Sequence, residues 1–215
     1  SVRDPGLRRR RWWCGMAQLI LLPIPVCLHL ASWLAPFFAY HFFTGDEGDS
    51  ALDAAFLATL VFLFVQAASF VLVVVVRRAI GRIGVGRYRL WGFTYLRWWF
   101  GGVMEQTASV YLLNGTPLYR VYLRLLGARI GRDVTIGSVG VAVPELLRVG
   151  DGAAIGSGVL IANARVAGGE LIVGNVDIGE GALVDSYVVM EEGVRIGVDA
   201  TVGSLSALRS GTQVA

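Results

Sequence analysis

The run VDSYVVMEEG (184–193) brings together side chains that can move protons. Two kinds of acid–base group occur in it, carboxylates and hydroxyls: Asp185, Ser186, Tyr187, Glu191 and Glu192. General acid–base catalysis needs such groups within hydrogen-bond reach of the reacting atoms. We predict that Asp185, Ser186 and Tyr187 line a groove as catalytic residues, with the two glutamates at the next corner of the chain. The alternative is that all five are solvated corner residues.

Two other side chains are candidates for a site. Glu145 interrupts a regular spacing of aliphatic residues, where the chain must bulge, and a bulge can form a site wall; the alternative is a plain surface charge. His29 lies inside a long apolar run, and an ionisable group within a membrane is by default a functional hypothesis. The alternative for His29 is a neutral imidazole bonded to a backbone carbonyl that Pro25 leaves free.

The elements that would position these residues differ between the two halves of the chain. The 215 residues are 55% hydrophobic and only 16% charged, which is more apolar than an average soluble domain. From Trp12 to Phe43 no residue is charged, and the 23 residues from Ala54 to Val76 contain neither charge nor histidine. A helix of that length covers roughly 34 Å, enough for a bilayer core of about 30 Å. We predict two transmembrane helices, at about 12–43 and 53–76, in a domain over 1–86.

The charges beside the spans predict their orientation. Arginines precede the first span and follow the second, and the loop between the spans is acidic, with Asp46, Glu47, Asp49 and Asp53. The positive-inside rule then places both chain ends in the cytoplasm, so we predict a multi-pass protein of the cytoplasmic (inner) membrane, in contact with the lipid bilayer. This topology explains the net charge of +3, and no motif indicates a nucleic-acid partner.

The segment 87–127 links the two halves. It is rich in Arg and Trp, which predicts interfacial and linking helices, with a third, re-entrant span in 87–114 as the alternative. Thr116 and Pro117 are typical of a helix start, and Gly127 of a helix end. The apolar residues of this helix follow helical spacing and predict its packed face: Leu118, Val121, Tyr122 and Leu125.

A period of six residues organises the rest of the chain, 128–215. Aliphatic side chains recur without a slip at Ile172, Ile178, Val184, Met190, Ile196, Val202, Leu208 and Val214. An earlier set, offset from this one, contains Ile130, Ile136, Val149, Ile155 and Ile161. A hexapeptide period is typical of a parallel β-helix, in which three hexads make one coil. We therefore predict a membrane α-helical hairpin followed by an all-β, left-handed parallel β-helix of between four and five coils.

The hexads resemble those of the left-handed β-helix acyltransferase superfamily. Three runs resemble more narrowly the membrane-bound terminal units of nonribosomal-peptide-synthetase-like proteins, the group that includes ε-poly-lysine synthetase: GTPLYRVYLRLLGARIGRDVTIGS (115–138), PELLRVGDGAAIGSGVLI (144–161) and IGEGALVDSYVVMEEGVRIGVDATVGSLSA (178–207). In that family each unit is a pair of spans plus a hexapeptide domain, and three tandem units accompany adenylation and carrier domains.

The resemblance implies a function and partners. It implies a unit that forms peptide or isopeptide bonds from aminoacyl thioesters held on the phosphopantetheine of a carrier domain, in the same or a partner chain, with no cofactor in the unit itself. It also implies a homotrimer or a tandem pseudo-trimer, because such enzymes place substrates between adjacent β-helices. The alternative is a non-catalytic unit that completes and anchors the trimer, with a possible role in product export.

One departure from the superfamily favours that alternative. Many hexapeptide acyltransferases use a histidine as general base, but the chain contains no histidine after His41. The same absence excludes the three-histidine zinc site of another branch of the superfamily, so we predict no metal.

Overall fold

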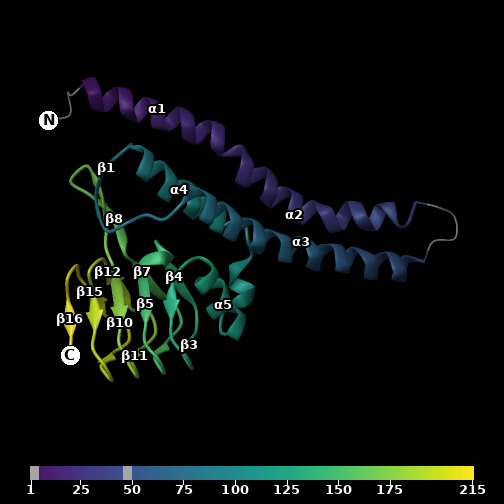
Figure 1. Ribbon diagram of the computed structural model, residues 1–215. Coiled ribbons are helices and arrows are strands. Elements are labelled where there is room, and N and C mark those ends of the chain that lie inside the picture. Colours follow the sequence, from purple (N-terminus) through teal and green to yellow (C-terminus); the bar gives the residue numbers. More distant parts are fainter. Residues whose placement is uncertain (1–4, 46–49) are drawn as a thin grey trace. The chain divides into compact units, whose positions relative to one another are not determined.

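The computed structural model describes residues 5–45 and 50–215, and it divides the chain into two compact units (Figure 1). The first unit contains the chain up to Ala79 together with Trp99–Ser109, and the second contains Ile80–Trp98 and Val110–Ala215. The segment 87–127 is therefore shared between both units. Three acidic residues of the predicted outer loop, Asp46, Glu47 and Asp49, lie outside the described residues, as does Arg3.

The first unit is built from apolar helices. Helix α1 covers Pro5–Leu21, α2 covers Pro23–Phe42 and α3 covers Ala51–Ile80. The first apolar run is broken at Leu22 because Pro23 and Pro25 have no backbone N–H to continue the helical ladder. By length and composition, the stretches Gly6–Phe42 and Ala51–Ile80 could each cross a bilayer, and only 11% of each apolar window is buried.

Helix α4 (Phe93–Glu105) has 13 residues, whereas a bilayer crossing needs about 20. At its end Glu105 accepts a hydrogen bond of 2.5 Å from Nε of Arg77, whose side chain is only 6% exposed. Gly101 permits this contact, because a Cβ there would lie 2.6 Å from Nη1 of Arg77. The pair thus ties the end of α4 to α3 within the first unit.

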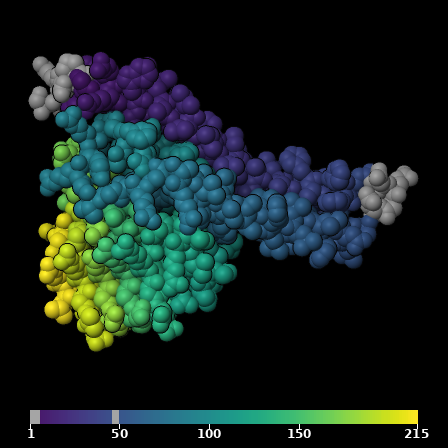
Figure 2. All heavy atoms as spheres, in the orientation of Figure 1, coloured from purple at the N-terminus to yellow at the C-terminus, as the bar shows by residue number. Residues whose placement is uncertain are grey.

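The second unit contains three parallel sheets that the chain visits in turn. The first sheet contains β2 (Arg129–Ile130), β5 (Leu147–Val149), β10 (Val176–Ile178), β13 (Arg195–Ile196) and β16 (Gln213–Val214). The second contains β3 (Thr135–Ile136), β6 (Ala154–Ile155), β11 (Leu183–Val184) and β14 (Thr201–Val202). The third contains β4 (Val139–Val141), β7 (Val159–Ala162), β12 (Val189–Glu191) and β15 (Ala207–Leu208). Figure 2 shows the successive turns of this coil in contact, from teal to yellow.

The aliphatic period fills the inside of the coil. Val184 lies in register with Ile155 on one side and Val202 on the other, and all three are buried. Met190 is fully buried between Ile161 and Leu208 of the neighbouring turns. The predicted inward positions are confirmed here, and the parallel pairing with them. The left-handed sense of the coil stays a prediction.

One predicted inward position is wrong. Ile172 belongs to β9 (Glu170–Val173), which forms a hairpin with β8 (Ala164–Ala167) through Gly168 and Gly169, both with positive φ. This hairpin is inserted between Ile161 and Ile178, so Ile172 fell into the period by chance. Its second strand, β9, also pairs antiparallel with β1 (Gly86–Arg89), so part of the link that we predicted as helical is extended.

Helix α5 (Pro117–Leu125) closes the first turn of the coil, after the short 3-10 helix η1 (Val110–Leu113). Tyr119 donates its hydroxyl to the Val139 carbonyl, Arg120 donates to that of Val134 (2.9 Å), and Nη2 of Arg124 donates to that of Ile130 (2.8 Å). These carbonyls lie on the three sides of the first turn of the coil. Within the described residues, no earlier turn is present to pair with them. The cap therefore satisfies backbone acceptors at the open edge of the sheets.

The sequence predicted the limits of α5 better than its packed face. The helix begins after Thr116, whose hydroxyl bonds the Leu113 carbonyl and does not cap the helix, and it ends before Gly127 with φ +106°. Tyr119, Tyr122 and Leu123 are buried. Of the predicted packed face, Tyr122 is confirmed, but Leu118 (62% exposed), Val121 (48%) and Leu125 (43%) are exposed, so that part of the prediction is wrong. The helix is instead oriented so that the polar groups of Tyr119, Arg120 and Arg124 reach the backbone carbonyls of the first turn.

We expect Arg124→Ala to lower the free energy of unfolding by about 2 kcal/mol, since hydrogen bonds from a charged donor contribute about 1.5–3 kcal/mol. Chemical unfolding of the chain in detergent, followed by tryptophan fluorescence, measures the change. Arg209→Ala, an exposed arginine on the last turn, is the control and should stay within about 0.5 kcal/mol of the parent. Equal effects of both substitutions would contradict a capping role for Arg124.

Candidate functional site

A column of serines marks one corner of the coil. Two residues after each strand of the second sheet the chain has a serine: Ser138, Ser157, Ser186 and Ser204. The position before each serine is glycine in three turns and Asp185 in the third turn. Glycine is needed at 156 because a Cβ there would lie 2.8 Å from the Ser186 backbone nitrogen. Asp185 is thus the one carboxylate in this column.

Asp185 is held by its neighbours in the column. Its carboxylate accepts hydrogen bonds from the Ser204 hydroxyl (2.5 Å) and from the Ser186 backbone N–H (2.7 Å). These bonds, that of Ser204 first, hold the pKa of Asp185 below its ordinary value. A carboxylate with a lowered pKa is a weaker proton acceptor, so the corner orients the Asp185 carboxylate more than it activates it.

Tyr187 completes the corner and is exposed. Its backbone has φ +59°, which is unusual for a residue other than glycine. Its ring lies against Gly158 of the preceding turn, where a Cβ would be 2.7 Å from Cδ1 of Tyr187. With 64% of its surface exposed, the phenol is available to a ligand. Asp185, Ser186 and Tyr187 are thus consecutive residues of one exposed corner, and their catalytic role stays a prediction.

The other two predicted site residues lie elsewhere. Glu145, in the 3-10 helix η2 (Pro144–Leu146), accepts a hydrogen bond from the Ile83 backbone N–H (3.0 Å). This bond holds the segment that contains Ile83, just before β1, against the coil. Glu145 therefore has a structural contact in the second unit. His29 is in α2, in the other compact unit, where its ring makes an edge contact with Trp33 at 6.5 Å. Neither residue is part of the serine corner.

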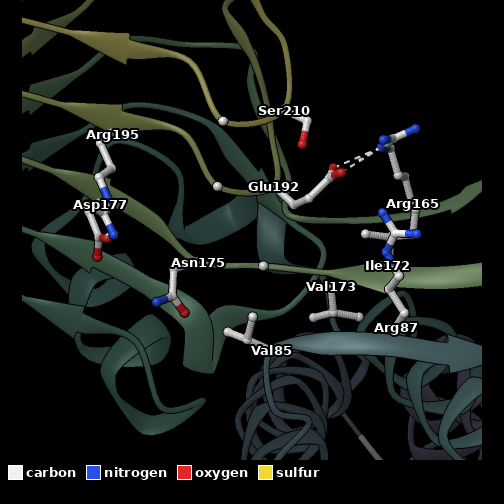
Figure 3. A pocket seen from close by; sticks show the side chains of 13 residues that line it. Val85, Arg87, Arg165, Ile172, Val173, Asn175, Asp177, Glu192, Arg195 and Ser210 are labelled. Carbon is white, nitrogen blue, oxygen red and sulfur yellow. Dashed lines mark hydrogen bonds and ion pairs between the residues drawn. The ribbon is translucent and has the colours of Figure 1, made fainter.

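A second feature is a cavity of about 370 Å³ at the base of the hairpin (Figure 3). Its charged lining comes from β1, from β8, from two strands of the first sheet and from the corner after β12: Arg87, Arg165, Asp177, Arg195 and Glu192. Glu192 is 6% exposed, and both of its oxygens accept from Nε of Arg165, at 2.8 and 3.0 Å. This partner raises the pKa of Arg165 further. Glu191 instead accepts from the Ser210 backbone N–H at 2.9 Å.

Asp177 lies on the outward face of the first sheet between two arginines. Nε of Arg148 and Nε of Arg195 are each 3.8 Å from one of its oxygens, on the neighbouring strands β5 and β13. The sequence analysis missed this row and the cavity. The outward residues carry no period, and the pairing of β1 with the hairpin brings Arg87 from more than 70 residues away.

Among the described residues, neither the serine corner nor the cavity has side chains arranged as a metal site. Across residues 5–45 and 50–215 no group of three His, Cys, Asp or Glu side chains is placed to hold a metal ion. The side chains at the serine corner can transfer protons, and those in the cavity can bind charged groups.

Comparison with known proteins points to one relative. The chain is 42% identical over 212 residues to the delta-poly-L-ornithine synthetase of Acinetobacter baumannii (strain AB307-0294). The match covers 98% of the chain. It covers only 16% of the relative, so the chain corresponds to a small part of that protein.

Two other comparisons add little. No family model matches the sequence. Among solved structures, serine acetyltransferase isoform 3 of Entamoeba histolytica, in complex with cysteine, is 16% identical, with 81% of this chain and 68% of that chain covered. The TM-score is 0.27, so this likeness supports no conclusion about the fold.

We expect Asp185→Asn to destabilise the protein near pH 7, by an amount that decreases as the pH falls below about 4. The folded-state pKa of Asp185 is lowered, so its stabilisation is present above the unfolded pKa of about 3.9 and is lost as pH falls through the folded value. Melting temperatures of both proteins between pH 3 and pH 7 test this. Asp133→Asn, at an exposed corner with positive φ, is the control. A difference at Asp185 that is constant over this pH range would contradict the assignment.

Proposed function

We propose that the chain is a membrane-anchored, acyltransferase-like unit of a peptide-synthetase-like enzyme. The observation that supports this most directly is the 42% identity with a protein named for poly-ornithine synthesis. Since the match covers 98% of the chain and 16% of the relative, the chain represents one unit of a larger assembly. Adenylation and carrier domains would belong to other parts of that assembly.

The proposed reaction joins an aminoacyl group to an amine. The aminoacyl group arrives as a thioester on carrier-bound phosphopantetheine, and the nitrogen of the acceptor amine attacks its carbonyl carbon. A C–N bond forms, the C–S bond breaks, the amine loses a proton and the carrier thiol is released protonated. At the serine corner, the exposed Tyr187 and the Ser186 hydroxyl can relay that proton, while Asp185 holds the Ser186 backbone N–H and the Ser204 hydroxyl. Much of the rate enhancement would come from holding two substrates together.

The membrane anchor is supported by the surface of the helices. Large apolar side chains of α2 and α3 are exposed, among them Phe38, Phe42 and Phe64. Exposure of that much apolar surface is unfavourable in water and favourable in lipid. The arginine-rich flanks orient both ends of the chain toward the cytoplasm, so the reaction would take place at the cytoplasmic face of the membrane. The coil that carries the reaction would be left-handed.

The proposed assembly is a trimer of coils, either of three chains or of tandem units. Apolar side chains are exposed around the serine corner and the adjoining third sheet: Leu160, Leu183, Tyr187, Val189 and Leu205. A neighbouring coil could cover these residues and bring its own side chains to the corner, as a closed ring of units requires.

A second candidate function is a non-catalytic unit that anchors the assembly and completes its trimer, with a possible role in export. The specific observation in its favour is the acid–base inventory. The coil contains no histidine, and the pKa of Asp185 is lowered, not raised toward neutrality. Under this function the sister units carry out the chemistry, and His29 belongs to an export path.

Single substitutions in the complete synthetase distinguish these functions. The variants are Asp185→Asn, Ser186→Ala, Tyr187→Phe, Glu145→Gln and His29→Ala. If Tyr187 transfers a proton, we expect Tyr187→Phe to lower the rate of polymer synthesis at least about 100-fold, the usual contribution of a general acid–base group. The total amount of polymer measures synthesis. The amounts of polymer on the two sides of the membrane measure export.

Tyr111→Phe is the matched control, since Tyr111 is 65% exposed on η1, and its variant should synthesise at the parental rate. Unchanged synthesis in all five variants would overturn the catalytic function and leave the structural one. Synthesis without export in the His29 variant would support an export role.

A further inference from the structure

The cavity at the base of the hairpin has an excess of positive charge. Three guanidinium groups line it, those of Arg87, Arg165 and Arg195, against the two carboxylates of Asp177 and Glu192. One positive charge is therefore uncompensated within the lining. The side chains of Arg87 and Arg195 are 73% and 68% exposed, so this excess positive charge is accessible to an anionic group of a ligand.

Arg165 has donors to spare. Both of its hydrogen bonds to Glu192 start from Nε, and within the described part of the chain its terminal nitrogens have no hydrogen-bond partner. Its side chain is 40% exposed. A guanidinium held by one edge presents its other N–H groups in a fixed geometry, which suits the paired oxygens of a carboxylate or phosphate.

Arg87 and Arg195 complete the basic lining from two sides. Arg87 extends from β1 beside Arg165, and Arg195 lies across the cavity beside Asp177 (Figure 3). The partners of both are at 3.8 Å, Glu170 for Arg87 and Asp177 for Arg195. That distance exceeds a hydrogen bond, so both guanidinium groups keep donors available to a ligand.

The remaining wall is open and partly apolar. Ile172 and Val173 of β9, together with Val85 just before β1, contribute aliphatic surface. Gly193 and Gly211 lie on successive turns of the coil with φ +81° and +75°. No side chain enters the cavity from these two positions. The volume of about 370 Å³ is thus available to a small polar group with a short aliphatic continuation.

We propose that this cavity binds a monoanionic oxyanion group of the substrate through Arg87, Arg165 and Arg195. The inference rests on the proposed function, which supplies two groups of this chemistry. One is the phosphate of the pantetheine arm that delivers the aminoacyl thioester, and the other is the carboxylate of the amino acid. Both present oxygens that guanidinium groups bind by paired hydrogen bonds.

Direct binding to the full 215-residue chain in detergent tests the inference. The probes are the methyl ester of pantetheine 4′-phosphate, a monoanionic phosphodiester, and L-ornithine, each with a partner that lacks the oxyanion, namely pantetheine and 1,4-diaminobutane. Isothermal titration calorimetry measures the affinities. We expect one of the two anions to bind at least 10-fold more tightly than its partner, and which one binds identifies the source of the oxyanion.

Substitutions of the lining arginines test whether the anion binds in this cavity. Arg87→Gln and Arg195→Gln should each weaken the favoured anion about 10-fold or more, because each removes a charged donor. Arg165 is left intact because its loss would strand the buried Glu192 carboxylate. Arg89→Gln is the matched control: Arg89 lies two residues from Arg87 on the same strand but does not line the cavity. Its affinity should equal that of the parent, and melting curves confirm that each variant is folded.

Three results would overturn the inference: no anion binds better than its partner, Arg89→Gln weakens binding as much as Arg87→Gln, or Arg87→Gln and Arg195→Gln leave the affinity unchanged. None of these measures turnover. Polymer synthesis that survives with no anion binding would refute the cavity site and spare the proposed function. Specific binding in a synthetase whose activity is independent of this unit would do the reverse.

Discussion

The structure of the second unit depends on the requirement that every turn of the coil place at least one aliphatic side chain per sheet inside. Each strand has only two to four residues, so no strand is stable alone. Stability comes from stacking: Met190 and Val184 are fully buried because turns lie on both sides of them. The first turn has no predecessor, so α5 takes that place through the bonds of Tyr119, Arg120 and Arg124. The six-residue period and the α5 cap therefore both follow from the need of every turn to have a neighbour on each side.

This constraint also decides where chemistry can occur. Inward positions must be aliphatic, which leaves outward positions, corners and insertions for polar groups. A regular corner exposes its side chains to water, as at Tyr187. The hairpin changes this at another corner, where Arg165 covers Glu192 and keeps its carboxylate buried and paired. An insertion therefore gives a repetitive coil a place for a partly enclosed, charged cavity.

The sequence predicts well what the period controls and poorly what distant pairing controls. Val184, Met190 and Ile196 were assignable because stacking demands the same residue type in every turn. Ile172 was misassigned because the hairpin restored the phase by chance, and its antiparallel partners Arg87 and Arg165 leave no periodic signal. Asp185 and Ser186 were recognisable as polar neighbours. The hydroxyl that lowers the Asp185 pKa comes from Ser204 on the next turn, and only the fold reveals that.

The serine corner and the cavity are joined by one face of the coil. The chain passes from Tyr187 to Glu192 through β12, a path of about 16 Å in extended conformation. The outward residues across this face are small or aliphatic, since Gly140, Leu160, Val189 and Ala207 lie in register on successive strands. A substrate with an anionic group in the cavity and a reactive group at Tyr187 would have to lie along this apolar face. Such a molecule needs an extended, weakly polar linker between its two ends, and a pantetheine arm has that form more closely than a free amino acid does.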